Sequence, residues 1–161
     1  MILIALGSNL ASQAGPPAAT LKGALVRLDQ LGVKILSVSS FYETPAWPNP
    51  SDPAFVNAVA TVHTALQPVE LLNLLHGVET EFGRMRSAPN AARTLDIDLL
   101  DYDGRVMVDG VTLPHPRLAD RSFVLVPLVE IAPDWTHPIT GQNMGELLAG
   151  RPDRDIPKKL A

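Results

Sequence analysis

The 161-residue sequence contains no cysteine, and aromatic residues make up only 5% of it. Without cysteine the chain has no disulfide bond, no thiol nucleophile and no cysteine-bound zinc or iron–sulfur centre. Long hydrophobic runs are also missing, because no apolar stretch approaches the roughly 20 residues that a helix needs to cross a bilayer. The apolar run at residues 2–6 is too short for a signal peptide, and no basic residues precede it. We therefore expect a cytoplasmic protein that does not act in a membrane.

An excess of positive charge is absent as well, since the net charge is −4 and the sequence pI is about 5.5. This balance argues against general binding of nucleic acid. Hydrophobic residues make up 46% of the chain and charged residues 19%, which argues against disorder. The length favours one domain that covers residues 1–161 and buries a hydrophobic core.

Lysine is missing from residue 35 to residue 157, where arginine supplies the positive charge. Most of these arginines lie between residues 84 and 121. Codon bias is one explanation, because chains rich in alanine and proline often favour arginine over lysine. The other explanation is that guanidinium groups, which bind two phosphate oxygens at once, hold a phosphate-rich ligand. Composition leaves both explanations open.

Hydrophobic periodicity and turn residues predict a mixture of strands and helices. Strands are expected at residues 2–6, 33–42, 54–64 and 95–102, with a hairpin at 106–111. Helices are expected at about residues 17–31, 68–82, 118–131 and 143–149, before a polar tail. Proline-rich residues 44–53 and arginine-rich residues 84–94 are expected to be loops, the second of them mobile. Because some strands follow one another directly, the order favours an α+β sandwich over a doubly wound parallel sheet.

Asp96 and Asp98 stand in the predicted strand 95–102, where side chains alternate between two faces. The apolar residues of this strand therefore share one face, and the two carboxylates share the other at a Cα separation of roughly 6.5–7 Å. Two carboxylates on one face repel each other and suit a hard cation such as Mg²⁺, as one ion or two. A solvated polar face is the alternative explanation, and the pattern does not decide between them.

Three arginines, Arg84, Arg86 and Arg93, precede the two aspartates. A cation beside arginines is the arrangement that phosphoryl transfer requires, since both neutralise charge on phosphate oxygens. His115 lies between two prolines that restrict its backbone, and it is a further candidate phosphate contact, although a lone histidine is more often structural. No glycine-rich motif with the Walker spacing is present, so a P-loop enzyme is excluded.

Phe55 and Asn57 share one face of the predicted strand 54–64. An aromatic ring beside an amide can stack on a flat heterocycle and form hydrogen bonds with its edge. Packing within the core is the alternative explanation for such a pair.

Six segments, in this order, resemble the family of 6-hydroxymethyl-7,8-dihydropterin pyrophosphokinase, the folate-pathway enzyme that moves a diphosphate from ATP to a pterin. The segments are ALGSNL at 5–10, SSFYETP at 39–45, DPAFVNA at 52–58, GRMR at 83–86, RTLDIDLL at 93–100 and the stretch from LPHPR at 113–117 to RSFVLVPLVEIAP at 121–133. They run nearly end to end, and RTLDID followed by Pro-His is the most specific. The resemblance implies a ferredoxin-like α/β/α sandwich with a mostly antiparallel central sheet.

The resemblance also implies roles for particular residues. Asp96 and Asp98 correspond to the two metal ligands of the family, which hold a pair of Mg²⁺ ions. Arg84 and Arg93 correspond to catalytic arginines that close over the phosphates. The implied ATP contacts are Arg84, Arg93, Thr112, His115 and Arg121. The implied pterin pocket consists of Thr44, Pro45, Phe55, Asn57 and Phe123, in which the two phenylalanine rings stack on the ligand.

The chain departs from the family pattern at residues 87–92, Gly110 and Pro116, where members often carry aromatic or basic residues. The leading hypothesis is therefore a Mg²⁺-dependent transfer of diphosphate from ATP to the hydroxymethylpterin that releases AMP, with no obligate protein partner. One alternative is a catalytically idle domain of the same fold that binds nucleotide or pterin, against which the intact aspartate pair argues. Another is a metal-dependent phosphate-ester hydrolase, for which the aromatic and amide residues would be arbitrary.

Overall fold

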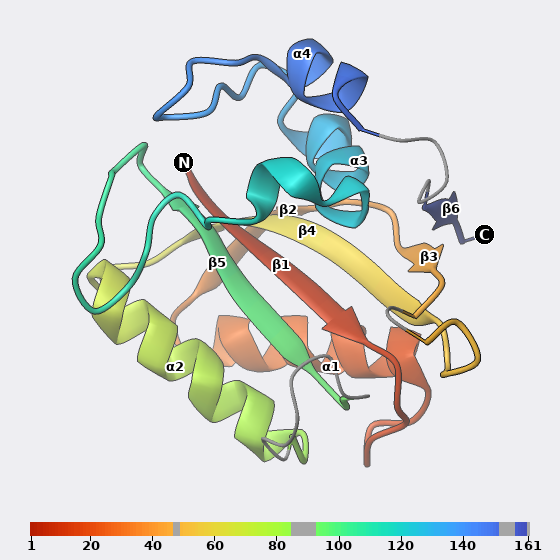
Figure 1. Cartoon of the computed structure of the whole chain (residues 1–161). Coiled ribbons are helices and arrows are strands. Elements are labelled where there is room, and N and C mark those ends of the chain that lie inside the picture. The colour runs from red at the N-terminus through yellow and green to blue at the C-terminus, as the bar shows by residue number, and fades with distance from the viewer. Residues whose placement is uncertain (47–48, 85–92, 152–156, 161) are drawn as a thin grey trace.

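A single antiparallel sheet forms the centre of the protein (Figure 1). The computed structural model describes residues 1–46, 49–84, 93–151 and 157–160. The strands are β1 (Ile2–Ser8), β2 (Lys34–Val38), β3 (Tyr42–Thr44), β4 (Phe55–His63), β5 (Asp96–Tyr102) and β6 (Lys158–Lys159). Their order is β5-β1-β4-β3-β6, β2 also pairs with β4, and each of these pairs is antiparallel. The predicted antiparallel sheet is confirmed.

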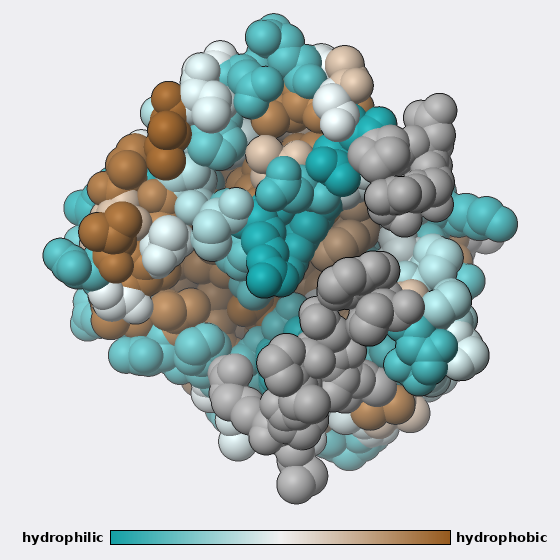
Figure 2. All heavy atoms as spheres, in the orientation of Figure 1, coloured by the Kyte–Doolittle hydropathy of each residue, from teal (hydrophilic) through white to brown (hydrophobic). Residues whose placement is uncertain are grey.

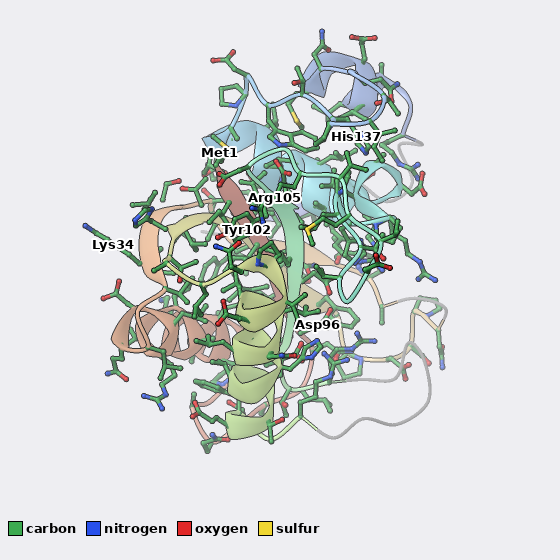
Figure 3. The ribbon with its side chains drawn as sticks, turned by 90° about the vertical axis from the view of Figure 1, so that its left-hand side faces the viewer. Met1, Lys34, Asp96, Tyr102, Arg105 and His137 are labelled. Carbon is green, nitrogen blue, oxygen red and sulfur yellow. The ribbon has the colours of Figure 1, made fainter. Side chains whose placement is uncertain are left out.

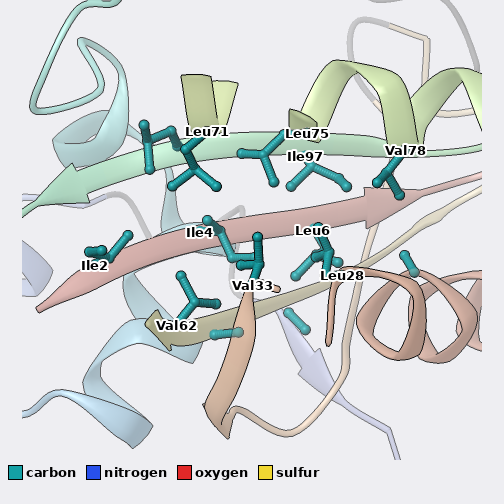
Figure 4. Close-up of a cluster of buried hydrophobic side chains, with 14 of the residues drawn as sticks. Ile2, Ile4, Leu6, Leu28, Val33, Val62, Leu71, Leu75, Val78 and Ile97 are labelled. Atoms are coloured by element: carbon teal, nitrogen blue, oxygen red, sulfur yellow. The ribbon is translucent and has the colours of Figure 1, made fainter. Parts of the chain in front are cut away.

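Helices cover both faces of the sheet and give it two separate hydrophobic layers. Helices α1 (Pro17–Gln30) and α2 (Pro68–Glu81) pack on one face, where Ile4, Leu6 and Ile97 meet leucines of both helices (Figure 4). Helices α3 (Ser122–Ile131) and α4 (Met144–Ala149) pack on the opposite face over Leu3 and Val59. Alternation along β1 explains the division, because Leu3 and Ile4 point to opposite faces. The result is the α/β/α sandwich predicted from the sequence.

The predicted strand 33–42 is wrong as one element, because it is divided into β2 and β3. The division falls at Ser39, whose backbone N–H donates to the Val59 carbonyl at 2.9 Å. The Val59 N–H in turn donates to the Ser39 side-chain Oγ at 3.0 Å. A side chain thus takes the place of a backbone acceptor, and the regular ladder is interrupted there.

The predicted helix 118–131 is also divided, by Arg121. A single 3₁₀ turn, η1 (Leu118–Asp120), precedes α3, and Arg121 between them has extended backbone with φ −120° and ψ 106°. The predicted hairpin at 106–111 is reduced to one isolated bridge between Met107 and Leu113. The predicted polar tail contains β6, which pairs with β3 at the edge of the sheet. Among the described residues, no helix combines the length and apolarity needed to cross a membrane.

Candidate active site

Asp96, labelled in Figure 3, and Asp98 lie at the start of β5. Both line a cavity together with Ser122 and Phe123 of α3. Ile97 between them is buried in the layer against α1 and α2, so the alternation of β5 turns the two carboxylates the other way. On the neighbouring strand, Gly7 pairs with Asp96 and Ala5 with Asp98. Because these two β1 residues are small, space for a ligand remains beside the carboxylates, whose side chains are 25% and 26% exposed.

Arg84 is held beside Asp96 at the end of α2. Its Nη1 donates to Asp96 Oδ1 at 2.5 Å and to Glu79 Oε2 at 2.7 Å, and the Arg84 side chain is only 15% exposed. Gly83, with φ +85°, ends the helix in the left-handed conformation that glycine adopts without strain. This turn brings the Arg84 guanidinium back toward β5.

Arg93 reaches Asp96 from the opposite direction. Its Nη1 lies 3.5 Å from Asp96 Oδ2, and its guanidinium carbon lies 5.9 Å from the centre of the Phe55 ring. The backbone of Arg93 is fixed by Asn9, whose Oδ1 accepts from the Arg93 N–H at 2.8 Å and whose own N–H donates to the Arg93 carbonyl at 3.1 Å. Arg86 and the rest of the predicted mobile loop at 85–92 lie outside the described residues.

Asp98 faces one arginine and one histidine. Arg121 Nη1 lies 3.3 Å from Asp98 Oδ2, and His115 Nε2 lies 3.9 Å from the same oxygen. Burial, together with the charge of Asp96, raises the pKa of Asp98 to about 6, although the neighbouring arginines oppose this shift. A protein-bound cation would lower this pKa again, because it favours the ionised carboxylate.

His115 is neutral at physiological pH. Burial first, and then the positive charge of Arg121, lower its pKa to about 4. Its Nδ1 accepts the N–H of Arg117 at 3.1 Å, so the proton of the neutral ring is on Nε2. The His115 ring therefore presents an N–H donor toward Asp98 and the space beside it.

Two cavities meet at these residues. The first has a volume of about 610 Å³ and lies toward α2 and the residue 108–116 segment, and the second has a volume of about 400 Å³ and lies toward β4 and α3. Arg93, Asp96, Asp98 and Arg121 line both cavities. Figure 2 shows strongly hydrophilic residues in the middle of this face of the molecule, between apolar surface and the grey residues. Two ligands could therefore be held on either side of the same four charged groups.

The second cavity combines flat apolar walls with a fixed amide. Phe55 and Phe123 both line it, and Asn57 Nδ2 donates to Thr44 Oγ1 at 3.0 Å. Asn57 is only 6% exposed and pairs with Gly7 of the neighbouring strand β1. Gly7 has no Cβ that would displace the Asn57 amide. The fixed Asn57 amide beside aromatic rings suits a planar heterocycle with hydrogen-bonding edges.

The two carboxylates at the junction, where the two cavities meet, fit Mg²⁺. Among the described residues, no group of three or more His, Cys, Asp or Glu side chains forms an all-protein metal cage. Two carboxylates on one strand face are nevertheless what Mg²⁺ uses when a phosphate substrate supplies the remaining oxygens. Asp96 and Asp98 could therefore hold a cation together with a phosphate ligand, but not by themselves as a closed site.

Comparison with known proteins decides the family. Residues 3–133 match the family described as 7,8-dihydro-6-hydroxymethylpterin-pyrophosphokinase, HPPK. The chain belongs to the HPPK family. A relative from Synechocystis sp., named 2-amino-4-hydroxy-6-hydroxymethyldihydropteridine pyrophosphokinase, is 38% identical over 148 residues, which is 91% of this chain and 73% of the relative. A Haemophilus influenzae relative of the same name is 40% identical over 84% of this chain and 83% of its own length.

The HPPK fold also occurs within longer chains. The crystal structure of wild-type Plasmodium falciparum HPPK-DHPS matches 92% of this chain with a TM-score of 0.71 at 14% identity, which confirms the ferredoxin-like fold. This chain spans only 40% of that protein. It likewise spans 20% of the folic acid synthesis protein fol1 of Pneumocystis carinii, to which it is 35% identical.

The structure brings together the residues that the sequence singled out. The first cavity is lined by Arg84, Thr112 and His115, the second by Thr44, Pro45, Phe55, Asn57 and Phe123, and both by Arg93, Asp96, Asp98 and Arg121. The roles of these residues stay predictions. Sequence reasoning missed Glu79 and Asn9, which fix Arg84 and Arg93. The signal for Glu79 was available in part, because Gly83 marks a helix end that joins residues five apart.

Proposed function

We propose that this protein transfers the diphosphate group of ATP to the hydroxymethyl group of 6-hydroxymethyl-7,8-dihydropterin and releases AMP, a step of folate biosynthesis. Membership of the HPPK family supports this reaction. The observation that carries the proposal is the meeting of two cavities at two carboxylates and two arginines. A transfer between two substrates needs both of them on either side of the transferred group, with positive charge at that point.

We assign the first cavity to ATP. Its volume of about 610 Å³ is sufficient for a nucleotide, and Arg84, Arg93 and Arg121 supply guanidinium groups in its wall. The neutral His115 offers an Nε2–H to a phosphate oxygen without adding charge. Thr112 lies along the same wall and is assigned as a further nucleotide contact.

We assign the second cavity to the pterin. The Phe55 and Phe123 rings provide stacking surfaces, while Asn57 and Thr44 provide hydrogen-bonding groups, beside which Pro45 completes the wall. A pterin held here would direct its hydroxymethyl group toward Asp96 and Asp98, which line both cavities. The hydroxymethyl oxygen could then attack the β-phosphorus in line, with AMP as the leaving group.

Mg²⁺ belongs to the same proposal, with two ions expected and Asp96 and Asp98 as the residues that hold them. Bound there, Mg²⁺ would neutralise charge on the phosphate oxygens and orient them. Phosphate oxygens would then replace the two aspartates as partners of the arginines now paired with them. Arg84 and Arg93 would then stabilise negative charge as it develops at the transferred group.

Product analysis tests the reaction and separates it from the alternatives. The protein is incubated with ATP, Mg²⁺ and the reduced hydroxymethylpterin, and nucleotides and phosphate are quantified by chromatography. We expect one AMP for each pterin diphosphate. Phosphate release without pterin would instead indicate a hydrolase, ADP a transfer of a single phosphoryl group, and no turnover an idle binding domain.

The aspartates are tested in the same assay. Asp96→Asn and Asp98→Asn should each lower AMP formation by at least about a hundredfold, which is the usual effect of losing one key electrostatic group. Asp103→Asn is the matched control, because Asp103 is exposed at the far end of β5 and pairs with the N-terminal ammonium at 2.8 Å. Unchanged Mg²⁺ dependence in either site variant would contradict the metal assignment.

Three wider expectations remain predictions. One domain that covers residues 1–161, a cytoplasmic location and the absence of an obligate protein partner all follow from the sequence reasoning. The absence of a protein partner is the expectation most worth testing, because in some relatives this fold is part of a longer chain.

A further inference from the structure

Glu79 is a buried acid that the proposed reaction does not use. It stands in the last turn of α2 with only 2% of its surface exposed. A carboxylate at the C-terminal end of a helix is opposed by the helix dipole, and its burial removes the water that would stabilise the charge. Glu79 therefore occupies an unfavourable position, which specific contacts must offset.

Two of its contacts lead directly to the junction of the cavities. Glu79 Oε2 accepts from Arg84 Nη1 at 2.7 Å and from the backbone N–H of Ile97 at 2.8 Å. Ile97 is the residue between Asp96 and Asp98, so the Glu79 carboxylate is anchored to β5 midway between the two proposed metal ligands. Arg84 is thereby held beside β5 by an acid that is itself bonded to the backbone of that strand.

The end of α2 joins the same two residues through the backbone. The Arg84 N–H donates to the Glu79 carbonyl at 3.1 Å, and the Gly83 N–H donates to the Thr80 carbonyl at 3.0 Å. This pair of bonds around a left-handed glycine is a Schellman motif, which places residues five apart side by side. The Arg84 side chain consequently begins next to Glu79 before any ion pair forms.

One nitrogen of Arg84 contacts two acids, of which only one is a proposed metal ligand. Nη1 contacts both Glu79 Oε2 and Asp96 Oδ1. Asp96 is the acid that a cation would use, and a guanidinium that depended on Asp96 alone would then lose its partner and be repelled by the cation. Glu79 lines the first cavity, but its bond to the Ile97 N–H keeps it on β5.

We propose that Glu79 is a positioning residue, which keeps the Arg84 guanidinium in the wall of the first cavity, beside Asp96, when Asp96 gives its carboxylate to a cation. The cation in this statement rests on the proposed function. The retention of Arg84 by Glu79 does not, because it is a property of the ligand-free protein. Glu79 acts through Arg84 and makes no contact with the reacting atoms.

The direct test weakens the ion pair between Asp96 and Arg84 by mutation, and it needs no metal, nucleotide or turnover. Asp96→Asn imitates a carboxylate whose charge has been neutralised. Proton exchange at the Arg84 guanidinium, including its Nη–H groups, is followed by ¹⁵N NMR, with Arg84→Lys to assign the signals. In Asp96→Asn we expect exchange within twofold of the wild type. In Asp96→Asn/Glu79→Gln we expect exchange at least tenfold faster.

The control pairs Asp96→Asn with Glu81→Gln, the same change two residues further along α2. Glu81 is exposed and pairs with Arg27 at 2.9 Å, so this variant should behave as Asp96→Asn alone. Slow exchange in Asp96→Asn/Glu79→Gln, or fast exchange in Asp96→Asn by itself, would overturn the proposal. If Glu79→Gln prevents folding, Glu79→Asp retains the charge on a shorter side chain and is expected to release Arg84 in the same comparison.

Single-turnover kinetics add a second measurement, which distinguishes positioning of Arg84 from a purely structural role of Glu79. If Glu79 acts through Arg84, Glu79→Gln should lower the single-turnover rate about tenfold in the wild-type background and by less than twofold in Arg84→Ala. Equal losses in the two backgrounds would show that Glu79 supports β5 rather than Arg84. Failure of the wild-type protein to form AMP would refute the proposed function, while the NMR comparison would still decide the role of Glu79.

Discussion

His115 Nε2 lies 3.9 Å from Asp98 Oδ2, and in this pair the usual order of proton affinity is reversed. The pKa of Asp98 is raised from 3.8 to about 6, mainly by burial and then by Asp96. The pKa of His115 is lowered from 6.5 to about 4, mainly by burial and then by Arg121. Around pH 5 the acid therefore retains its proton while the imidazole is neutral, so this pair forms no salt bridge in the ligand-free protein.

The two shifts predict opposite effects of pH on stability. Between pH 4 and 6 the folded chain holds the Asp98 proton more tightly than the unfolded chain, so the ionisation of Asp98 lowers stability as pH rises. His115 is protonated more readily in the unfolded chain, so its contribution is lost as pH falls from 6.5 to 4. In the wild type the two effects largely cancel over this range.

Variants should expose each effect separately in urea unfolding followed at several pH values. The stability of Asp98→Asn relative to wild type should rise by about 1–2 kcal/mol from pH 4 to pH 6.5 and then stay constant. The relative stability of His115→Gln should fall over the same range by a similar amount. Asp109→Asn, on an exposed turn, is the control and should give a flat difference. Parallel curves for the two site variants would contradict the reversed pair.

Gly7→Ala should damage the second cavity specifically. A Cβ on Gly7 would lie 2.8 Å from Asn57 Oδ1, so the amide must move and its bond to Thr44 must break or lengthen. We expect pterin affinity measured by calorimetry to fall by at least about tenfold, the equivalent of one buried hydrogen bond. Nucleotide affinity should change by less than twofold.

Gly77→Ala is the matched control for this substitution. Gly77 lies inside α2, and a Cβ there meets no atom within 4 Å. Alanine is the better helix former, so this variant should be more stable by up to about 1 kcal/mol and should bind both ligands as the wild type does. Equal effects of the two substitutions on pterin binding would show that Asn57 is not the group affected.

Phe123→Ala should weaken pterin binding by about 1–3 kcal/mol, the range measured for loss of one aromatic stacking partner. The ring lines the second cavity and is absent from the walls of the first. Phe82→Ala is the control, because the Phe82 ring packs near Gly23 and lines neither cavity. If calorimetry showed nucleotide affinity falling while pterin affinity stayed constant, the assignment of the two cavities would be reversed.

Asn9→Ala should affect both stability and turnover. Asn9 is 3% exposed, and its side chain joins the Arg93 N–H at 2.8 Å to the Pro53 carbonyl at 3.1 Å. Removing it deletes two partly buried hydrogen bonds, at a cost of about 1–3 kcal/mol in the free energy of unfolding. Because Arg93 is then less well positioned, the single-turnover rate should fall more than ATP affinity. Asn73→Ala, on the exposed side of α2, should change neither quantity.

Much of the fold followed from periodicity and turn residues. The strands 54–64 and 95–102 are predicted within one residue of β4 and β5 at each end, because apolar and β-prone residues alternate with polar ones over part of both segments. The divisions at Ser39 and Arg121 were not predicted. The side chains of these residues contact Val59 and Asp98, which are distant from them in the sequence. The clustering of the candidate residues came from family motifs, because spacing alone left Asp96 and Asp98 as either a cation site or a solvated face. The bonds from Glu79 to the Ile97 N–H and from Asn9 to Arg93 could not be predicted, because they join residues far apart in the sequence.

The same two arginines that separate the cavities also touch the aromatic walls of the second one. Arg121 lies 5.4 Å from the centre of the Phe123 ring and 3.3 Å from Asp98, while Arg93 lies 5.9 Å from the Phe55 ring and 3.5 Å from Asp96. Phosphates that draw these guanidinium groups away would change what the two rings contact. A ligand between the rings would in turn change the positions of both arginines. If the two substrates bind as proposed, their affinities should therefore be thermodynamically coupled, and any such coupling must be reciprocal. If bound nucleotide changes the affinity for the second ligand by some factor, the bound second ligand must change the affinity for nucleotide by the same factor.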